Sequence, residues 1–455
     1  MPPVPRRSTR PVVLIHGYSD RGESFARWRN ELAARGIHAT DISVCTWESL
    51  TNEVSIKDVA EGLDRALRTR AGLDADQPFD AIVHSTGMLV IRAWLTTYAE
   101  RRDRLRHLIA LAPATFGSPL AHKGRSWLGA LFKGNREWGP DFLEAGDLIL
   151  DGLELGSRYT WDLAHLDLLG AAPMYGPTGS TPYAFVFCGN VPYRGLKRLI
   201  GEAGTDGVVR LAGCALNTRK IVVDLTRDSA RSAGTDRTRV EPWANVDDLP
   251  LHVVNGADHG SILADPPDPL IELVVAALGV NSRQQYDAWR TEADRRLGAG
   301  RTKTDAWQQF VIRVIDERND PVRDWNLQIL AGDDRRLDAF DADVHTYRSD
   351  PSLRSFHVNL SKLKITSRTR LRLRLIASSG STLVGYHGVG SEKITLTSAP
   401  ASDPGKWDAQ LDLSPTIGDQ GVKLFFPFTT TLVEIRINRE PLPLSGENKV
   451  TRWIA

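Results

Sequence analysis

The hydrophobic pattern of this 455-residue chain changes near residue 300. Before that point, short runs rich in Val and Ile alternate with segments whose apolar residues recur at three- and four-residue spacing. The uninterrupted apolar runs predict buried strands at residues 11–16, 41–46, 80–84, 108–111, 183–187 and 251–255. The three- and four-residue spacing predicts helices at residues 24–35, 55–70 and 88–100. Strands without polar alternation, separated by helices, predict a parallel sheet covered on both faces, and therefore an α/β domain.

From about residue 305 the apolar residues recur at every second position instead. Short alternating stretches joined by Gly, Pro, Asp and Ser turns are typical of an antiparallel β-sandwich. They lie at residues 310–315, 325–330, 369–375, 393–397, 409–413 and 431–437. A polar helical pattern at residues 282–297 separates the two regions. We therefore expect an α/β domain over residues 1–281, a helical connector over 282–304 and a β-sandwich domain over 305–455.

The strongest chemical signal is the segment 80–92, in which a predicted strand runs into Ser85 and a predicted helix begins within two residues. This context is that of a nucleophile elbow, in which a sharp turn lifts a serine hydroxyl above the edge of the sheet. Ser85 is the predicted nucleophile, and the N–H of Thr86 is aimed at the place where an oxyanion would form. Gly87 matches the last glycine of the G-x-S-x-G pattern, whereas Val83 replaces the first. The alternative is a serine that only caps the helix.

The end of the first predicted strand carries a second element of such a site. Residues 12–18 end in the sequence His16-Gly17-Tyr18. A glycine here lets the backbone turn back over the site, so that the N–H of Tyr18 becomes the second oxyanion donor. We expect His16 to orient this loop rather than to act as a base.

A serine hydroxyl needs a base to remove its proton and a carboxylate to orient that base. On a sheet of this kind the chain order is Ser, then acid, then His. His259 is the predicted base because it lies in a turn directly after the strand at 251–255. His252 lies inside that strand and is expected in the core, while His84 is expected to point away from Ser85.

Three aspartates are candidates for the acid. Asp206 is preferred because it lies in the glycine-flanked loop 204–209. Asp258 adjoins the predicted base, and neighbouring side chains in a turn usually diverge. Asp224 lies in a strand-like stretch and is the second choice.

Taken together, these segments resemble the α/β-hydrolase lipases. Residues 84–92 resemble the H-S-x-G-G-L-V-x-R elbow of that family, and residues 12–18 its first strand with the oxyanion turn. Residues 111–119 resemble the strand end that precedes the lid. Residues 205–209 resemble the D-G-x-V acid loop of bacterial lipases and of the lecithin–cholesterol acyltransferase branch.

The resemblance covers residues 10–280 and implies an α/β-hydrolase fold. It implies Ser85, Asp206 and His259 as a catalytic triad, with Tyr18 and Thr86 as oxyanion donors. Met88 departs from the family because it replaces the second glycine of the pair after the elbow. We expect its side chain in the substrate pocket, and the chain-length preference of the family is therefore not carried over.

One long interval, residues 115–181, interrupts the α/β rhythm and corresponds to the lid. An insertion of this length in a compact domain is commonly a lid or a binding segment. We expect its apolar part to line the substrate pocket with Trp127, Leu128, Leu131 and Phe132. Such side chains above a serine hydrolase suit an acyl chain, and the flanking cations suit an interface. The alternative is a packed insertion that never opens.

Charge and composition narrow the partners. With 57 Lys and Arg against 56 Asp and Glu, the chain has no overall field to attract nucleic acid, and we expect no nucleic-acid partner. No apolar stretch approaches the ~20 residues of a membrane span, and the N-terminus lacks an apolar signal core. With three cysteines, reduced thiols in a cytoplasmic protein are expected, although export without a signal peptide stays open. No metal-ligand spacing or dinucleotide fingerprint predicts a metal or cofactor.

The β-sandwich carries one further candidate. Arg370, Arg372 and Arg374 alternate with leucines and therefore share one face of a strand. This face could dock to phosphate head groups or an acidic polymer. The alternative, which we favour, is a solvated face or a charged guard against edge pairing.

These observations predict a serine hydrolase of carboxylic esters with an apolar, lipid-like substrate and an acyl-enzyme intermediate. Phospholipid and acylglycerol substrates are both open. The alternatives are an acyltransferase with the same triad and a non-catalytic binding protein on a hydrolase scaffold. A toxin-like lipase with the sandwich as its docking part is a further one.

Overall fold

The structure is a computed structural model of the whole chain. It describes residues 10–17, 25–37, 42–45, 53–99, 102–122, 147–192, 203–226, 238–241, 249–332, 335–336, 344–347, 349–363, 370–390, 395–398, 405–412, 414 and 424–441. The chain divides into two compact units. The first comprises Met1–Thr218 and Trp243–Asp305, and the second comprises Arg219–Pro242 and Ala306–Ala455.

The first unit is built on a six-stranded parallel sheet with the order β2-β1-β3-β4-β5-β8. Its strands are β1 (Val12–Ile15), β2 (Ile42–Cys45), β3 (Phe79–His84), β4 (Leu105–Leu111), β5 (Tyr183–Gly189) and β8 (Leu251–Val254). Each overlaps one of the six predicted apolar runs, so the prediction of a parallel α/β sheet is confirmed. Strand β3 lies between β1 and β4 in the interior of the sheet. The residues that follow these strands therefore emerge at one common edge.

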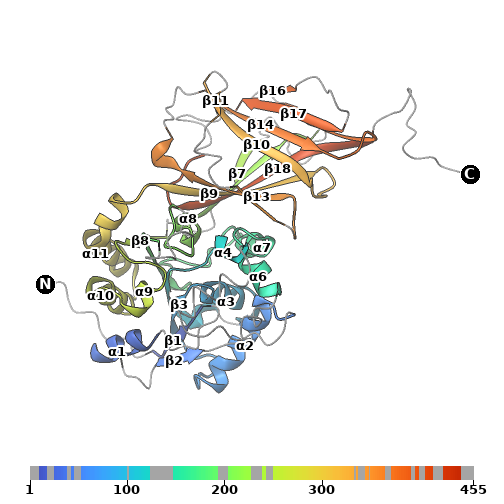
Figure 1. Cartoon of the computed structure of the whole chain (residues 1–455). Helices are drawn as coiled ribbons and strands as arrows, with labels where there is room; N and C mark the ends of the chain where they lie inside the picture. The colour runs from blue at the N-terminus through green and yellow to red at the C-terminus, as the bar shows by residue number, and fades with distance from the viewer. Residues whose placement is uncertain are drawn as a thin grey trace, which may run out of the picture. The chain divides into compact units, whose positions relative to one another are not determined.

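Helices cover both faces of this sheet (Figure 1). One face packs against α1 (Ala26–Ala34), α10 (Asp268–Ala277) and α11 (Arg283–Thr302) in a shared apolar core. The other is covered by α2 (Ile56–Thr69) and α3 (Gly87–Ala93), which continues into the π-helical turn η3 (Trp94–Tyr98). Helix α2 begins at a capping box, in which the side chains of Ser55 and Asp58 bond each other's backbone N–H. Among the described helices, none combines the length and apolar character that a bilayer crossing requires.

Helix α11 overlaps the expected connector but packs into the core of the first unit. Its Tyr286 and Trp289 are buried against Phe185 of β5, with ring centroids 5.4 and 4.5 Å away. The hydroxyl of Tyr286 also donates to the carbonyl of Ala184 at 3.0 Å. The long polar face suggested a linker, whereas the few aromatic residues on the opposite face fix the helix to the sheet.

The second unit contains two sheets that enclose a separate apolar core. One has the order β11-β10-β14-β17-β16, with strands β10 (Asp324–Ala331), β11 (Arg335–Arg336), β14 (Leu371–Ser378), β16 (Thr395–Ser398) and β17 (Lys406–Asp412). The other has the order β12-β13-β9-β18-β6-β7, with β15 (Val384–His387) paired to β18. Its strands are β6 (Thr218–Asp224), β7 (Thr238–Glu241), β9 (Trp307–Asp316), β12 (Val344–Thr346), β13 (Leu353–Asn359) and β18 (Thr429–Pro441). This arrangement provides the predicted C-terminal β-domain.

Two features of this unit differ from a simple antiparallel sandwich. Strands β9 and β18 pair in parallel, which is open to them because more than a hundred residues separate their starts. Strands β6 and β7 lie within the sequence of the α/β region, yet they join the sheet of the second unit. Sequence alone identified residues 221–225 as strand-like but did not indicate their sheet.

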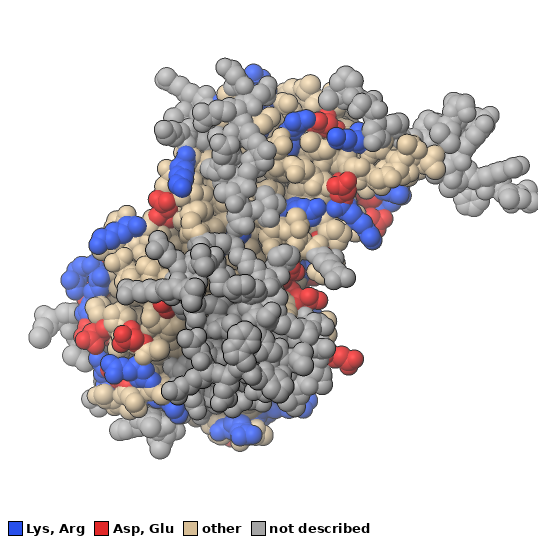
Figure 2. All heavy atoms as spheres, viewed as in Figure 1, with Lys and Arg blue, Asp and Glu red and all other residues tan. Residues whose placement is uncertain are grey.

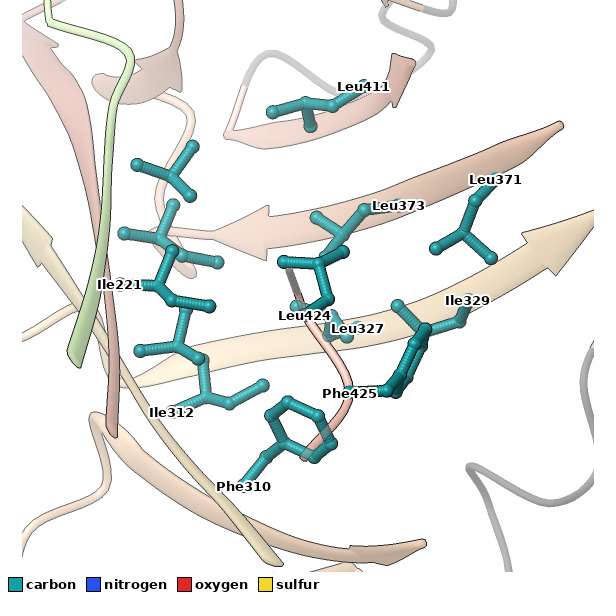
Figure 3. Close-up of a pocket in the computed structure, with 13 residues that line it drawn as sticks. Ile221, Phe310, Ile312, Leu327, Ile329, Leu371, Leu373, Leu411, Leu424 and Phe425 are labelled. Atoms are coloured by element: carbon teal, nitrogen blue, oxygen red, sulfur yellow. The ribbon is translucent and has the colours of Figure 1, made fainter. Parts of the chain in front are cut away.

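A cavity of about 60 Å³ lies in the core of the second unit, between side chains of both sheets (Figure 3). Its lining is apolar throughout and includes Phe310, Leu327, Leu373 and Phe425. With no polar side chain in its lining, this cavity has no means to orient a reacting group. The predicted site residues Ser85, Asp206 and His259 all lie in the first unit.

Candidate active site

Ser85 stands at the carboxyl end of β3, immediately before α3, in a strained turn. Its φ is +53°, a left-handed conformation that non-glycine residues rarely adopt and that costs roughly 1–3 kcal/mol. The backbone of neighbouring segments holds it there: the Ser85 N–H donates to Leu111 O at 3.3 Å, and the Ala114 N–H donates to Ser85 O at 3.1 Å. The hydroxyl-bearing residue is only 3% exposed. Such strain held at a strand end is typical of a nucleophile elbow.

Two glycines make this turn sterically possible. A Cβ on Gly87 would lie 2.5 Å from the carbonyl oxygen of Ile15, so the helix could not approach β1 as it does. A Cβ on Gly17 would lie 2.7 Å from Cβ and 3.3 Å from Oγ of Ser85. The Nδ1–H of His16 donates a hydrogen bond to the carbonyl oxygen of Gly17 at 2.6 Å, which helps to fix the backbone at this glycine. Val83 remains in register with its neighbours in the sheet, so the missing first glycine of the motif does not interrupt β3.

Asp206 and His259 are joined by a buried hydrogen bond. The Nδ1 of His259 lies 2.9 Å from Oδ2 of Asp206, and both side chains are fully buried. The other carboxylate oxygen accepts the N–H groups of Val208 and Val209 at 3.0 and 2.9 Å. The backbone joins the same pair, because the His259 N–H donates to Asp206 O at 3.0 Å. A carboxylate fixed in this way holds the imidazole in one tautomer, with the proton on Nδ1.

The other candidate acids have different partners. Asp258 accepts the N–H groups of Gly260 and Ser261 through Oδ1, at 3.0 and 2.7 Å, in the turn that begins α9 (Ser261–Ala264). Asp224 ends β6 in the second unit, and its Oδ1 accepts both the N–H and the hydroxyl of Thr226. Of the three aspartates, Asp206 is therefore the one whose carboxylate contacts His259.

His84 contacts the predicted base, which the sequence did not indicate. Its Nε2 lies 3.0 Å from the carbonyl oxygen of His259, and the two ring centroids are 4.7 Å apart. Burial, followed by the nearby His259, lowers the pKa of His84 well below its ordinary value. Residue 84 was expected only to point away from Ser85. No local signal could have revealed its contact with a residue 175 positions further along the chain.

Part of the predicted lid packs into the first unit. Residues 147–181 include α6 (Asp147–Leu153) and α7 (Arg158–Asp167). Asp167 of α7 binds Arg92 of α3 through two hydrogen bonds of 2.7 and 2.8 Å, both side chains being fully buried. Arg92 also donates to Thr115 O at 2.5 Å, in the loop that follows β4. Burial lowers the pKa of Arg92, but the Asp167 carboxylate raises it by more, so the guanidinium stays charged.

Two more of the predicted site residues lie in helix α3 or at its start. Thr86 is fully buried at the start of α3, and Met88 is buried in the first turn of that helix. Tyr18, the second predicted oxyanion donor, lies outside the described residues, as do Trp127, Leu128, Leu131 and Phe132. The described residues contain no cluster of histidine, cysteine or acidic side chains suited to a metal ion.

A thiol next to the acid does not provide a competing nucleophile. Cys188 and Cys214 are both buried and unbridged. Burial raises the pKa of Cys214 well above its ordinary value, and neighbouring Cys188 and Asp206 act in the same direction. Because the thiolate is the reactive form, the Cys214 thiol is structural.

The parallel sheet, the elbow after its third strand and the Asp–His pair at the same edge define an α/β-hydrolase fold. No protein-family model and no curated protein matches the chain. Among solved structures, phospholipase PlaB from Legionella pneumophila superposes with a TM-score of 0.74 at 23% identity, over 98% of both chains. The same enzyme in complex with thio-NAD gives a TM-score of 0.74 at 22% identity, again over 98% of both. At this identity the likeness establishes the fold, and it extends over both units.

Proposed function

We propose that this protein is a serine hydrolase that cleaves carboxylic esters with apolar acyl chains, and that Ser85, Asp206 and His259 are its catalytic triad. The observation that carries the proposal is the buried Asp206–His259 hydrogen bond at the sheet edge where Ser85 occupies its strained turn. The likeness to a solved structure titled as a phospholipase supports a lipid ester as the substrate.

In this mechanism His259 removes the proton from Ser85 as Oγ attacks the ester carbonyl. Asp206 keeps the Nδ1–H of His259 directed toward its carboxylate and stabilises the imidazolium that forms. The N–H groups of Thr86 and Tyr18 hold the oxyanion of the tetrahedral intermediate, and each donor contributes roughly 3–4 kcal/mol to the transition state. His259 then gives its proton to the leaving alcohol, and water releases the acyl group by the reverse steps.

The substrate pocket includes Met88 in this proposal, together with Trp127, Leu128, Leu131 and Phe132 of the lid. Met88 is buried in the first turn of the helix that begins after Ser85, and this position next to the proposed nucleophile supports the role. An unbranched, flexible thioether can adapt to an acyl chain. Phospholipid and acylglycerol share the ester that this site would cleave, so both are substrates to test.

The experiment is hydrolysis of p-nitrophenyl esters with acyl chains of two to sixteen carbons. We expect turnover by the wild-type protein to rise with chain length and to vanish in Ser85→Ala. Ser157→Ala is the control, because Ser157 is a buried serine that caps α7 through its bond to Thr160 N. A short-chain optimum would contradict the lipid substrate and keep the triad. Absence of wild-type turnover on every ester would contradict the hydrolase function and favour a binding protein.

Acyl transfer to an alcohol would proceed through the same acyl-enzyme. Adding glycerol to the ester assay separates the two outcomes, because a transferase forms glyceride at the expense of free acid. We expect free acid to predominate, and predominant glyceride would replace hydrolysis by transfer.

The second part of the proposal, which the sequence pattern alone did not favour, is contact with a lipid surface through Arg370, just before β14, and Arg372 and Arg374 within it. Arg370, Arg372 and Arg374 line a shallow groove of about 460 Å³ in the second unit. Arg374 binds Asp408 at 2.5 Å and Arg370 binds Asp412 at 3.2 Å, so two carboxylates offset part of the positive charge. Strand β14 lies inside its sheet, so these arginines do not guard a sheet edge. Figure 2 shows acidic and basic side chains interspersed over the described part of the visible face.

Sedimentation with vesicles tests this contact. We expect the protein to bind phosphatidylglycerol vesicles more tightly than phosphatidylcholine vesicles, with binding that weakens as salt is added. Replacing all three arginines by glutamine is expected to remove that preference. An unchanged preference in the triple variant would assign these arginines to a solvated face.

A further inference from the structure

His84 is held at the end of β3 with its ring against the predicted base. It precedes Ser85 directly and is only 5% exposed. Its Nε2 is 3.0 Å from the carbonyl oxygen of His259, and its ring centroid is 4.7 Å from that of His259, with the ring planes tilted by 47°. One residue thus links the strand that carries the nucleophile to the loop that carries the base.

This contact fixes the proton positions of His84. A carbonyl oxygen only accepts hydrogen bonds, so Nε2 of His84 carries a proton and donates a hydrogen bond to His259 O. The titratable groups facing His84 are His259 and His16, with Asp206 behind His259. Burial and the two histidines all favour a neutral ring at position 84, since a charged one would be poorly solvated beside like charges.

His259 is consequently held at three separate points. Asp206 accepts from the ring at Nδ1, the carbonyl of Asp206 accepts the backbone N–H, and His84 donates to the backbone carbonyl. The two bonds to Asp206 fix the tautomer and one side of the loop. The hydrogen bond from His84 connects the loop that carries His259 to β3, the strand that leads into Ser85.

We propose that His84 is a positioning residue that sets the placement of the His259 imidazole relative to Ser85 by holding the His259 carbonyl and packing against its ring. This inference rests on the proposed serine-hydrolase function and extends it. The Nε2–H of His84 donates a hydrogen bond to the His259 carbonyl and keeps its proton, so in this proposal His84 takes no part in proton transfer. Its effect on rate arises because a base misplaced by about 1 Å can cost roughly 100-fold.

Two substitutions separate the hydrogen bond from the packing. His84→Phe keeps an aromatic ring and removes the donor, whereas His84→Gln carries an amide N–H at nearly the position of Nε2. The readouts are kcat and KM for the preferred p-nitrophenyl ester, the pH profile of kcat/KM, and the melting temperature. The matched control is His165→Phe in α7, where Nδ1 of His165 likewise donates to a backbone carbonyl, Trp161 O, at 2.8 Å.

We expect His84→Phe to lower kcat by roughly 10- to 100-fold with little change in KM, and His84→Gln to recover most of that loss. The acid limb of the profile should stay in place in His84→Gln, because burial and the neighbouring histidines favour a neutral ring at position 84. His165→Phe should retain wild-type kcat. Equal losses in both His84 variants that follow their melting temperatures would overturn the proposal, as would a displaced acid limb in His84→Gln.

The outcomes also separate this proposal from the one on which it rests. An active wild-type enzyme whose His84→Phe variant keeps full kcat contradicts the role of His84 alone. A wild-type protein that hydrolyses no ester contradicts the hydrolase function itself, and the role of His84 with it.

Discussion

At the scale of single residues, the site depends on backbone positions that leave no room for a side chain. Gly17 is the case that touches the nucleophile directly, because its missing Cβ lets the end of β1 lie beside Ser85. Ser85 itself keeps a left-handed backbone that only its surroundings enforce. Single substitutions at these positions and at the proposed acid test whether this local geometry determines activity.

Gly17→Ala tests this crowding. The new Cβ would lie 2.7 Å from Cβ of Ser85, so the serine must move, and kcat/KM for a p-nitrophenyl ester should fall by roughly 100-fold. The control is Gly62→Ala in α2, where nothing lies within 4 Å of the added methyl group. Gly62→Ala should retain activity and gain about 0.5–1 kcal/mol of stability. Wild-type kinetics in Gly17→Ala would show that the loop can retreat and would contradict the prediction.

Asp206→Asn tests the orientation of the base. The amide cannot hold the same tautomer of His259, and loss of the correct tautomer in an Asp–His pair costs roughly 10,000-fold in kcat. The comparison is Asp258→Asn, which alters the adjacent carboxylate that caps α9. Steady-state kinetics should show a large loss in the first variant and near wild-type kcat in the second. The reverse order would make Asp258 the acid.

At the scale of elements, the buried Arg92–Asp167 pair fixes helix α7 to helix α3. Removing one member leaves the other charge buried, which typically costs about 3–5 kcal/mol. We therefore expect Arg92→Met to lower the free energy of unfolding by that amount in urea titrations. Arg92→Met combined with Asp167→Leu should recover part of the loss, because no charge is then left unpaired. A cost below about 1 kcal/mol in the single variant would mean that the pair is solvated.

Strand β8 carries a pH-sensitive group in its core. Burial lowers the pKa of His252 from its ordinary 6.5 to about 4, although Asp294 opposes this. Between pH 6.5 and pH 4, His252 is protonated in the unfolded chain but stays neutral in the folded protein. His252 therefore costs no stability above pH 6.5. As the pH falls toward 4, its burial lowers the free energy of unfolding by on the order of 3 kcal/mol.

His252→Phe should remove this part of the acid sensitivity, because a phenyl ring can pack against Phe187 and Trp289 without titrating. Urea unfolding of both proteins at pH 7 and pH 4.5 measures the difference. The lowered pKa of His84 also reduces the free energy of unfolding as the pH falls. Because His84 is present in both the wild type and the variant, the comparison isolates His252. Equal losses on acidification would show that His252 gains its proton in the folded state.

The elements themselves were largely predictable from the sequence. The six apolar runs of the α/β region are the six strands of its sheet, since strands buried on both faces show an uninterrupted pattern. The strand–turn–helix context predicts Ser85 as the nucleophile, and loop context predicts Asp206 and His259 as the acid and the base. Their catalytic roles stay predictions, although the structure joins Asp206 to His259 by a hydrogen bond. Helix α11 shows where pattern reading stops, because Tyr286 and Trp289 outweigh a polar face that indicated a connector.

At the scale of the whole molecule, what could not be predicted depends on pairing between distant segments. Residues 221–225 were visible as a strand, yet only the fold places β6 in the sheet of the second unit. The contact of His84 with His259 is of the same kind, since it depends on how two distant loops meet. The likeness to phospholipase PlaB covers 98% of both chains and therefore includes the folds of both units.

The most direct test of the central claim is covalent labelling of the whole protein with a fluorophosphonate, followed by peptide mass spectrometry. The reagent reacts with a serine only where a base has activated it. The account predicts a single adduct on Ser85, strongly reduced in His259→Ala and in Asp206→Asn. An unlabelled wild-type protein, or an adduct on a different serine that persists in Ser85→Ala, would contradict the account.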